Sequence, residues 1–416
     1  MKNQVDFYTI ILTFVVLICF LVLGSSAAFA SSENRASASY TVPYAYITNK
    51  ENVTVIDTTT NTVTATVNVG GYPRTIAVTP DGTKAYVATE TTSGNNVCVV
   101  NTTTNNVTAT INIHANLGGG LIVTPDGSKV YLTDDGVFGS AVIVIDTSTD
   151  TIIKRVYVGI NPHELAVTPD GTKVYVEAFS ISGENVWVIN TTTNDVTATL
   201  SVGSVPKTFA ITPDGRKVYV TDSYSTKVSV IDTATDNVTA TVEVGKWPSG
   251  VAFTPDGTKA YVVNFDSNNV SVIDTATNNV IATVNVGSQP EGVAVNPNGT
   301  KVYVTNEGSD NISVIDTSNN TVIATIPVGT TPKEVAVAPD ATKVYVVNYA
   351  SNNITVIDTT TNKMITTMNV GDYPKRIVFI PSSSGQLPPT PPPEQAPSTP
   401  PPEQASPTPP PEQVHQ

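Results

Sequence analysis

The chain has 416 residues, of which 40% are hydrophobic and only 13% are charged, and its formal net charge is −14. A chain this acidic has no basic stripe to neutralise the phosphates of nucleic acid, and its charge also opposes adsorption to an anionic membrane. Two cysteines and three histidines are too few for a disulfide framework or a Cys/His zinc cage, so we expect no metal and no cofactor.

The N-terminal residues have the pattern of a secretory signal peptide. An uncharged, mostly apolar run covers residues 9–24, Lys2 precedes it, and Ala28-Phe29-Ala30 follows as a small-x-small cleavage pattern. The run is shorter than the roughly 20 residues of a spanning helix, and an uncleaved anchor is the alternative. We therefore expect a signal peptide over 1–30, a short linker over 31–43, and a secreted or cell-surface protein that does not remain in the membrane.

Residues 44–381 are built from one repeated unit. The turn TPDG, the segment VIDT and the tyrosine of KVYVTN each recur at intervals of about 40–45 residues. Within one unit, residues 250–287 read GVAFT, PDGT, KAYVVNF, DSNN, VSVID, TATNN and VIATVNV, closed by a glycine. Four short runs rich in Val, Ile, Thr and Tyr that alternate with turn residues predict four strands.

The number of strands predicts the architecture. Three strands precede the first TPDG turn (45–48, 53–57 and 63–69), seven complete units follow, and a last strand covers 376–380. This pattern predicts an all-β fold, a β-propeller of eight four-stranded antiparallel blades, in which the last strand completes the blade of the first three. Seven blades are the alternative. In the seventh TPDG turn Ala341 replaces glycine, and a left-handed alanine there costs about 1 kcal/mol.

The composition changes after Pro381. Residues 382–416 contain TPPPEQ three times and almost no apolar side chains. Proline at this density predicts a disordered tail in the polyproline II conformation, which acts as a spacer. A ligand for a proline-binding module is the alternative.

The segments YAYITN, KVYVTN, VSVIDTATNNVIATVNVG and VAVTPDGTK resemble the YVTN β-propeller repeat of archaeal cell-surface and surface-layer proteins. The resemblance covers residues 44–381. It implies an extracytoplasmic propeller used for surface structure, adhesion or recognition, and it brings no set of catalytic residues. Relatives are often seven-bladed and often carry further C-terminal modules, and this chain departs from both features.

The innermost strand of each blade begins just after the proline of a VGxxP segment, so the residues there are expected to line the mouth of the central channel. They are Arg74, His163, Glu164, Lys207, Glu291, Lys333, Glu334, Lys375 and Arg376. His163 beside Glu164 is the one place where acid/base chemistry is conceivable, but neighbouring strand residues point in opposite directions. Such a mixed ring can bind an anionic or polar ligand, which makes these residues candidate binding residues; the alternative, which we favour, is a solvated, salt-bridged rim without paired carboxylates or metal ligands.

The face that carries the blade connections differs most between the copies, and a binding surface is expected there. These connections carry Tyr72, Trp247, Gln289, Asp372 and Tyr373. The aromatic residues among them could stack on sugars or anchor a partner protein. Alternatively they only cover the junctions between blades.

Asn-x-Ser/Thr sequons in or beside the predicted turns are candidate glycosylation sites. They lie at Asn52, Asn101, Asn106, Asn190, Asn237, Asn269, Asn298, Asn311, Asn319 and Asn353. Cys98 stands where other copies have Thr54, Ser229 or Ser271, and it is expected to be inert and half-buried.

These features predict a non-enzymatic secreted or cell-surface propeller with a structural or recognition role, whose partner is a cell-surface glycan or protein. The alternative is an enzyme or redox subunit, lactonase-like or similar to a quinone-dependent dehydrogenase, that acts at the mouth of the channel.

Overall fold

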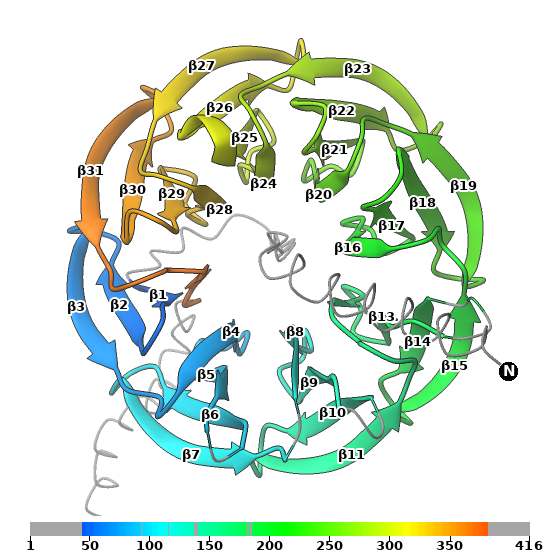
Figure 1. The fold of residues 1–416 in the computed structure, drawn as a ribbon, viewed down its shortest axis with the longest axis vertical. Helices are drawn as coiled ribbons and strands as arrows, with labels where there is room; N and C mark the ends of the chain where they lie inside the picture. The colour runs from blue at the N-terminus through cyan, green and yellow to red at the C-terminus, as the bar shows by residue number, and fades with distance from the viewer. Residues whose placement is uncertain are drawn as a thin grey trace, which may run out of the picture. The chain divides into compact units, whose positions relative to one another are not determined.

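The computed structural model describes residues 44–92, 94–114, 116–136, 140–180, 183 and 185–381. The predicted signal peptide, the linker and the proline-rich tail lie outside these residues. Eight four-stranded antiparallel sheets form a ring around a central axis (Figure 1), which confirms the prediction of eight blades. In the part of the chain that is described, no helix is long and apolar enough to cross a membrane.

The blades are numbered here in chain order. Blade 1 contains β1 (Tyr44–Thr48), β2 (Val53–Asp57), β3 (Thr62–Val67) and β32 (Arg376–Phe379). Blade 2 contains β4 (Tyr72–Val78), β5 (Lys84–Glu90), β6 (Asn96–Asn101) and β7 (Asn106–Asn112). Blade 3 contains β8 (Leu117–Val123), β9 (Lys129–Asp134), β10 (Ala141–Asp146) and β11 (Thr151–Tyr157). Blade 4 contains β12 (Leu165–Val167), β13 (Lys173–Glu177), β14 (Val186–Asn190) and β15 (Asp195–Leu200).

The second half of the ring continues the series. Blade 5 contains β16 (Pro206–Ile211), β17 (Lys217–Asp222), β18 (Lys227–Asp232) and β19 (Asn237–Glu243). Blade 6 contains β20 (Pro248–Phe253), β21 (Lys259–Asn264), β22 (Asn269–Asp274) and β23 (Asn279–Asn285). Blade 7 contains β24 (Pro290–Val295), β25 (Lys301–Asn306), the short 3-10 helix η1 (Glu307–Ser309), β26 (Asn311–Asp316) and β27 (Thr321–Pro327). Blade 8 contains β28 (Pro332–Val337), β29 (Lys343–Asn348), β30 (Asn353–Asp358) and β31 (Lys363–Asn369).

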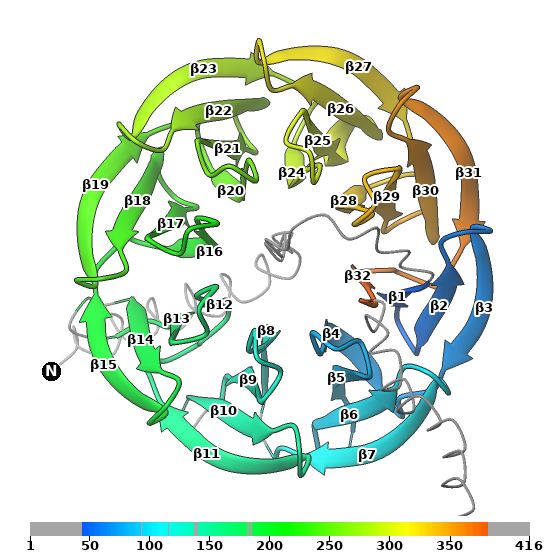
Figure 2. The same cartoon turned by 180° about the vertical axis from the view of Figure 1, so that it is seen from behind.

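The ring closes within blade 1. There β32 pairs antiparallel with β1, and Tyr46 lies opposite Val378, so the last strand of the chain completes the sheet begun by the first three, as predicted. In blades 2–8 the first strand is innermost and the fourth forms the outer edge, whereas in blade 1 the innermost strand is β32 and the outer edge is β3 (Figure 2).

The apolar core lies between blades. Each cluster joins the alternating inward-facing residues of one blade to those of the next; Val314 of blade 7, for example, packs in one cluster with Val335 and Val346 of blade 8. Strands that bury both faces in this way need Val and Ile at most positions, and this requirement accounts for the composition of the repeat. Cys98 belongs to such a cluster and is only 2% exposed, so the half-buried position predicted for it is wrong. Its thiol donates a hydrogen bond to the carbonyl oxygen of Val69 (3.1 Å), and burial raises its pKa.

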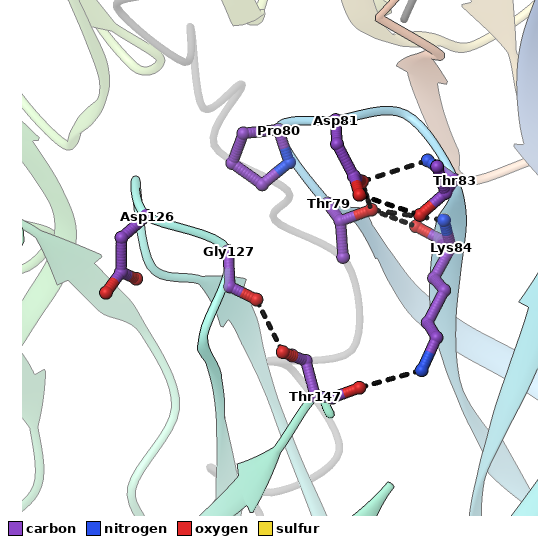
Figure 3. A pocket seen from close by; sticks show the side chains of 8 residues that line it. All are labelled: Thr79, Pro80, Asp81, Thr83, Lys84, Asp126, Gly127 and Thr147. Atoms are coloured by element: carbon purple, nitrogen blue, oxygen red, sulfur yellow. Dashed lines mark hydrogen bonds between the residues drawn. The ribbon is translucent and has the colours of Figure 1, made fainter. Parts of the chain in front are cut away.

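The TPDG turns are held by their own side chains. Thr79 donates a hydrogen bond through Oγ1 to Asp81 (2.5 Å), and Asp81 in turn accepts one from the backbone N–H of Thr83 (3.0 Å; Figure 3). These contacts confirm that the repeated aspartates serve local turn geometry. Ala341 occupies the turn with φ +60°, in the left-handed conformation predicted for it.

A polar girdle links each blade to the next on this same face. In blade 2, Lys84 Nζ donates to the carbonyl oxygen of Thr147 (2.7 Å; Figure 3) and pairs with Asp150 (2.8 Å), and Tyr86 donates to the same carboxylate (2.6 Å). Asp150 has φ +54°, which directs its side chain back toward the neighbouring blade. Equivalent pairs recur around the ring, among them Tyr131 with Asn194, Tyr175 with Asp236, Tyr219 with Asn278, Tyr261 with Asn320, Tyr345 with Asn61 and Tyr46 with Asn105. The repeated tyrosine and the repeated Asn or Asp of the neighbouring turn are therefore two halves of one contact.

Candidate functional site at the channel mouth

In five blades the inner strand carries an irregularity that follows its proline. In blade 5, Pro206 pairs with Asp222 but Phe209 pairs with Val220, so the inner strand carries one extra residue. Blades 2, 6, 7 and 8 show similar register shifts after the same proline. A bulge re-aims the side chains of the bulged strand. The residues that follow these prolines are therefore turned toward the channel and its mouth.

The acidic residues at the mouth are buried. Glu164 is 8% exposed, and Glu291 and Glu334 are each 5% exposed, so the prediction of a solvated rim is wrong for these three. The reason is that the inner strands of eight blades converge on a narrow channel. Arg376 Nη2 of blade 1 lies 3.9 Å from Glu164 Oε1 of blade 4, although blades 2 and 3 separate them in the ring.

Two of the carboxyl groups form a pair that the sequence prediction missed. Glu177 ends β13 and is buried, and its backbone N–H donates to the carbonyl oxygen of Glu164 (3.0 Å). Burial and the neighbouring Glu164 raise the pKa of Glu177 well above its ordinary value, and burial raises the pKa of Glu164 to about 7. The prediction that the mouth lacks paired carboxylates is therefore wrong.

The sequence did contain a signal for Glu177. Most other units carry a small or apolar residue at this strand position, such as Thr133, Thr221 and Thr305. The residue at this strand position is uncharged in the other units, so packing within the blade does not explain the glutamate in this one.

Lys207 lies among these carboxyl groups. Burial lowers the pKa of its ammonium group, while Glu291 and Glu164 act in the opposite direction. Among the described residues, Lys207 Nζ makes no hydrogen bond and no ion pair within 4 Å. Its charge is balanced through space by the surrounding carboxylates.

The remaining members come from blades 7 and 8. Burial raises the pKa of Glu291 to about 7, against the effect of Lys207, and Lys333 Nζ lies 3.6 Å from Glu307 Oε1. Burial likewise raises the pKa of Glu334 to about 7, against the effect of Arg376. We refer to these residues together as the channel cluster: Glu164, Glu177, Lys207, Glu291, Glu307, Lys333, Glu334 and Arg376.

The channel cluster contains buried polar atoms without partners. Glu164 Oε2, Glu291 Oε1 and Glu334 Oε2 accept no hydrogen bond from the described residues. A buried carboxylate oxygen without a donor costs about 1–3 kcal/mol. Glu164 and Glu291 interact through space with Lys207, and Glu164 and Glu334 interact with Arg376. The three unpartnered oxygens beside these two cations constitute a site for polar molecules, and their carboxyl groups have pKa values of about 7, as a general acid or base requires.

The other predicted mouth residues lie apart from this cluster. Arg74 Nε pairs with Glu90 (3.0 Å) in blade 2, and burial together with Arg74 lowers the pKa of Lys375. His163 Nδ1 donates a hydrogen bond to the carbonyl oxygen of Gly118 in blade 3. His163 and Glu164 thus contact different blades, which confirms that the two side chains point in different directions.

The aromatic residues of the blade connections form two groups. Tyr373 is 44% exposed, and its ring centroid lies 5.1 Å from that of Tyr349. Trp247 is partly buried between Tyr224 (5.3 Å) and Phe265 (6.1 Å). Tyr72 is 49% exposed, while Gln289 and Asp372 are also exposed.

All ten sequon asparagines are partly or fully exposed, and those with exposed side chains are Asn106, Asn237, Asn298 and Asn319. The side-chain oxygens of Asn101 and Asn190 instead accept hydrogen bonds from the N–H groups of their own turns. No group of three or more His, Cys, Asp or Glu residues within the described ranges has a geometry that could hold a metal ion.

The fold and the channel cluster define an eight-bladed β-propeller with a polar site on its axis. By sequence, the chain belongs to the family described as lactonase, seven-bladed β-propeller, whose model matches residues 44–245 and 233–374. Here the family's fold is built with eight blades. No curated protein matches the sequence.

Several solved structures share the fold. The dihydro-heme d1 dehydrogenase NirN in complex with DHE has a TM-score of 0.69 and 13% identity over 86% of this chain and 80% of its own. A putative 6-phosphogluconolactonase from Bacteroides uniformis has a TM-score of 0.56 and 16% identity over 81% and 99%. Hydrazine synthase from Kuenenia stuttgartiensis has a TM-score of 0.54 and 24% identity over 71% and 98%.

These findings correct the predicted function. Membership of a lactonase family contradicts the prediction of a non-enzymatic surface protein, and the similar structures include enzymes. They favour the alternative, an enzyme that acts at the mouth of the channel.

Proposed function

We propose that this protein hydrolyses a lactone, a cyclic ester, at the channel cluster. The observation that carries the proposal is the buried pair Glu164 and Glu177 beside Lys207, with one carboxylate oxygen of Glu164 unpartnered. Family membership supplies the reaction class.

The pair divides the roles of base and acid. Glu164, with a pKa of about 7, is ionised in a large fraction of molecules at neutral pH and can take a proton from an attacking water molecule. Burial and the neighbouring Glu164 raise the pKa of Glu177 well above its ordinary value, so its carboxyl group is suited to give a proton to the ring oxygen as the ester bond breaks.

Lys207 supplies the positive charge. Water attack on the lactone carbonyl places negative charge on its oxygen, and a partly buried ammonium group stabilises that charge more strongly than water does. Because Lys207 holds no direct partner among the described residues, it needs no rearrangement to meet the substrate. Arg376, 3.9 Å from Glu164, keeps the base ionised for part of the time and fixes its position.

The test is lactone hydrolysis by the purified full-length chain, with gluconolactone as the probe and spontaneous opening as the baseline. We expect Glu164→Gln to lower kcat by about 100-fold or more. Glu243→Gln is the matched control, since Glu243 ends the outer strand β19, where it faces Lys227 at 3.7 Å and accepts a hydrogen bond from Thr226 Oγ1 (2.7 Å). No turnover above the baseline, or equal loss in both variants, would exclude the proposal; reduction of a quinone or dye instead would point to a redox subunit.

We further propose that the mature protein is secreted and glycosylated, as the apolar run of residues 9–24, the exposed sequons and the likeness to YVTN repeats suggest. Intact-mass measurement after cell fractionation tests both points. A mass equal to that of the full chain, found in the cytoplasm, would contradict them.

A further inference from the structure

An aromatic platform lies directly beside the channel cluster. It consists of Tyr373, in the connection from β31 to β32, and Tyr349, in the loop from β29 to β30; their ring centroids are 5.1 Å apart and their planes are inclined by 44°. Lys333 Nζ lies 5.3 Å from the Tyr349 centroid and 3.6 Å from Glu307. One side chain of the channel cluster, Lys333, therefore contacts the platform.

The backbone holds Tyr373 in an unfavourable conformation to present its ring. Tyr373 has φ +50°, a left-handed conformation that costs a non-glycine residue about 1–2 kcal/mol. Its N–H donates to Asn352 Oδ1 (2.8 Å), which fixes this geometry, yet the side chain remains 44% exposed. The same left-handed conformation recurs at Trp247, Gln289 and Thr331, so it belongs to the turn of the blade connection, and at Tyr373 this turn leaves an aromatic ring exposed.

Polar groups surround the two rings. Asn352 Nδ2 donates to Asp372 Oδ1 (3.2 Å), and Asp372 and Asp310 are exposed at the edge of the platform. An aromatic face bordered by carboxylates and an amide matches a sugar ring, whose C–H groups stack on the tyrosines while its hydroxyl groups donate to the carboxylates.

We infer that the substrate is an aldonolactone that carries a second sugar ring: the lactone ring enters the channel cluster and the second sugar lies on Tyr373 and Tyr349. This inference rests on the proposed lactone hydrolysis and adds the class of substrate. Pre-positioned stacking binds the distal sugar in the ground state and the transition state alike, so its effect appears in KM more than in kcat.

The second aromatic group provides a matched control. Tyr224 is 52% exposed and packs on Trp247 at 5.3 Å, on the same face of the ring, but no contact among the described residues joins this group to the channel cluster. Tyr224→Ala removes the same side chain from an equivalent pair, so it isolates the effect of position.

The experiment compares cellobionolactone, which has two rings, with gluconolactone, which has one. We expect a higher kcat/KM for the two-ring lactone, and we expect Tyr373→Ala to reduce that value about five- to tenfold through KM while gluconolactone hydrolysis is unchanged. Tyr373→Phe should retain the preference, and Tyr224→Ala should affect neither substrate. Equal rates for the two lactones, or an equal loss with Tyr224→Ala, would overturn the inference and leave the proposed hydrolysis intact.

The absence of hydrolysis with either lactone would exclude the proposed function. In that case, calorimetric binding of the two product acids, cellobionate and gluconate, still tests the platform. Tighter binding of cellobionate than of gluconate, weakened by Tyr373→Ala, would support the platform. Equal binding of the two acids would overturn it.

Discussion

The girdle of tyrosines offers a matched pair of substitutions within one chain. Tyr175 and Tyr303 occupy the same place in blades 4 and 7, and both are fully buried. Tyr175 donates to Asp236 Oδ1 (2.7 Å), whereas the hydroxyl of Tyr303 has no hydrogen-bond partner among the described residues. Changing each to phenylalanine removes only the hydroxyl group.

The two changes should therefore differ in effect. A hydrogen bond to a charged group contributes about 1.5–3 kcal/mol. Asp236 keeps its ion pair with Lys173 (2.7 Å), so we expect the lower end, about 1.5 kcal/mol, for Tyr175→Phe. Tyr303→Phe removes a buried polar group that lacks a partner, and it should leave the free energy of unfolding unchanged or slightly higher.

Thermal unfolding followed by circular dichroism compares the variants. At about 2–4 °C per kcal/mol for a domain of this size or somewhat smaller, Tyr175→Phe should lower Tm by about 3–6 °C and Tyr303→Phe should not lower it. Equal decreases in the two variants would refute the view that the tyrosine hydroxyl stabilises the ring through the neighbouring turn.

Three further predictions concern the turns and the channel cluster. Ala341→Gly should raise the free energy of unfolding by up to about 1 kcal/mol in denaturant titrations, because relief of the left-handed alanine (about 1–2 kcal/mol) exceeds the entropy lost on folding glycine (about 0.5–1 kcal/mol); a decrease would show that the turn is not strained. The pKa of Glu291 rises from 4.5 to about 7 on folding, so the contribution of this group to the free energy of unfolding is fully present below about pH 4.5 and is lost as pH rises toward 7 and above. Glu291→Gln should therefore weaken the pH dependence of the denaturation midpoint between about pH 5 and 8. An unchanged pH dependence would contradict the burial of Glu291 as a protonated acid. Lys207→Met should lower kcat for lactone hydrolysis about 100-fold while the circular dichroism spectrum is retained, and full activity would exclude its role at the oxyanion.

The fold could be predicted almost completely because every blade carries the same sequence pattern. The strand at Val53–Asp57 was predicted to the residue, and the closing strand was predicted one residue too long at Ile380. Because the sequence pattern occurs eight times in the same order, an uncertain strand boundary in one copy is resolved by the other copies. The number of blades then follows from the number of strands.

The site could be predicted only in part, because its contacts are non-local. The sequence pattern singled out the residues after the VGxxP prolines, several of which belong to the channel cluster, but their burial depends on contacts across the ring, which no local pattern reveals. Arg376 and Glu164 meet only because the ring curves back on itself. Likewise, Tyr349 became part of the platform because the loop after β29 lies beside the connection that carries Tyr373.

The dependence of lactone hydrolysis on pH tests the central claim most directly. With Glu164 as general base and Glu177 as general acid, kcat/KM of the full-length protein should rise with pH through an apparent pKa of about 7 and fall again at higher pH as Glu177 loses its proton. Glu164→Gln should abolish the rise together with most of the activity. A profile without that ionisation, or one that Glu164→Gln leaves unchanged, would contradict the assignment of the channel cluster as the active site.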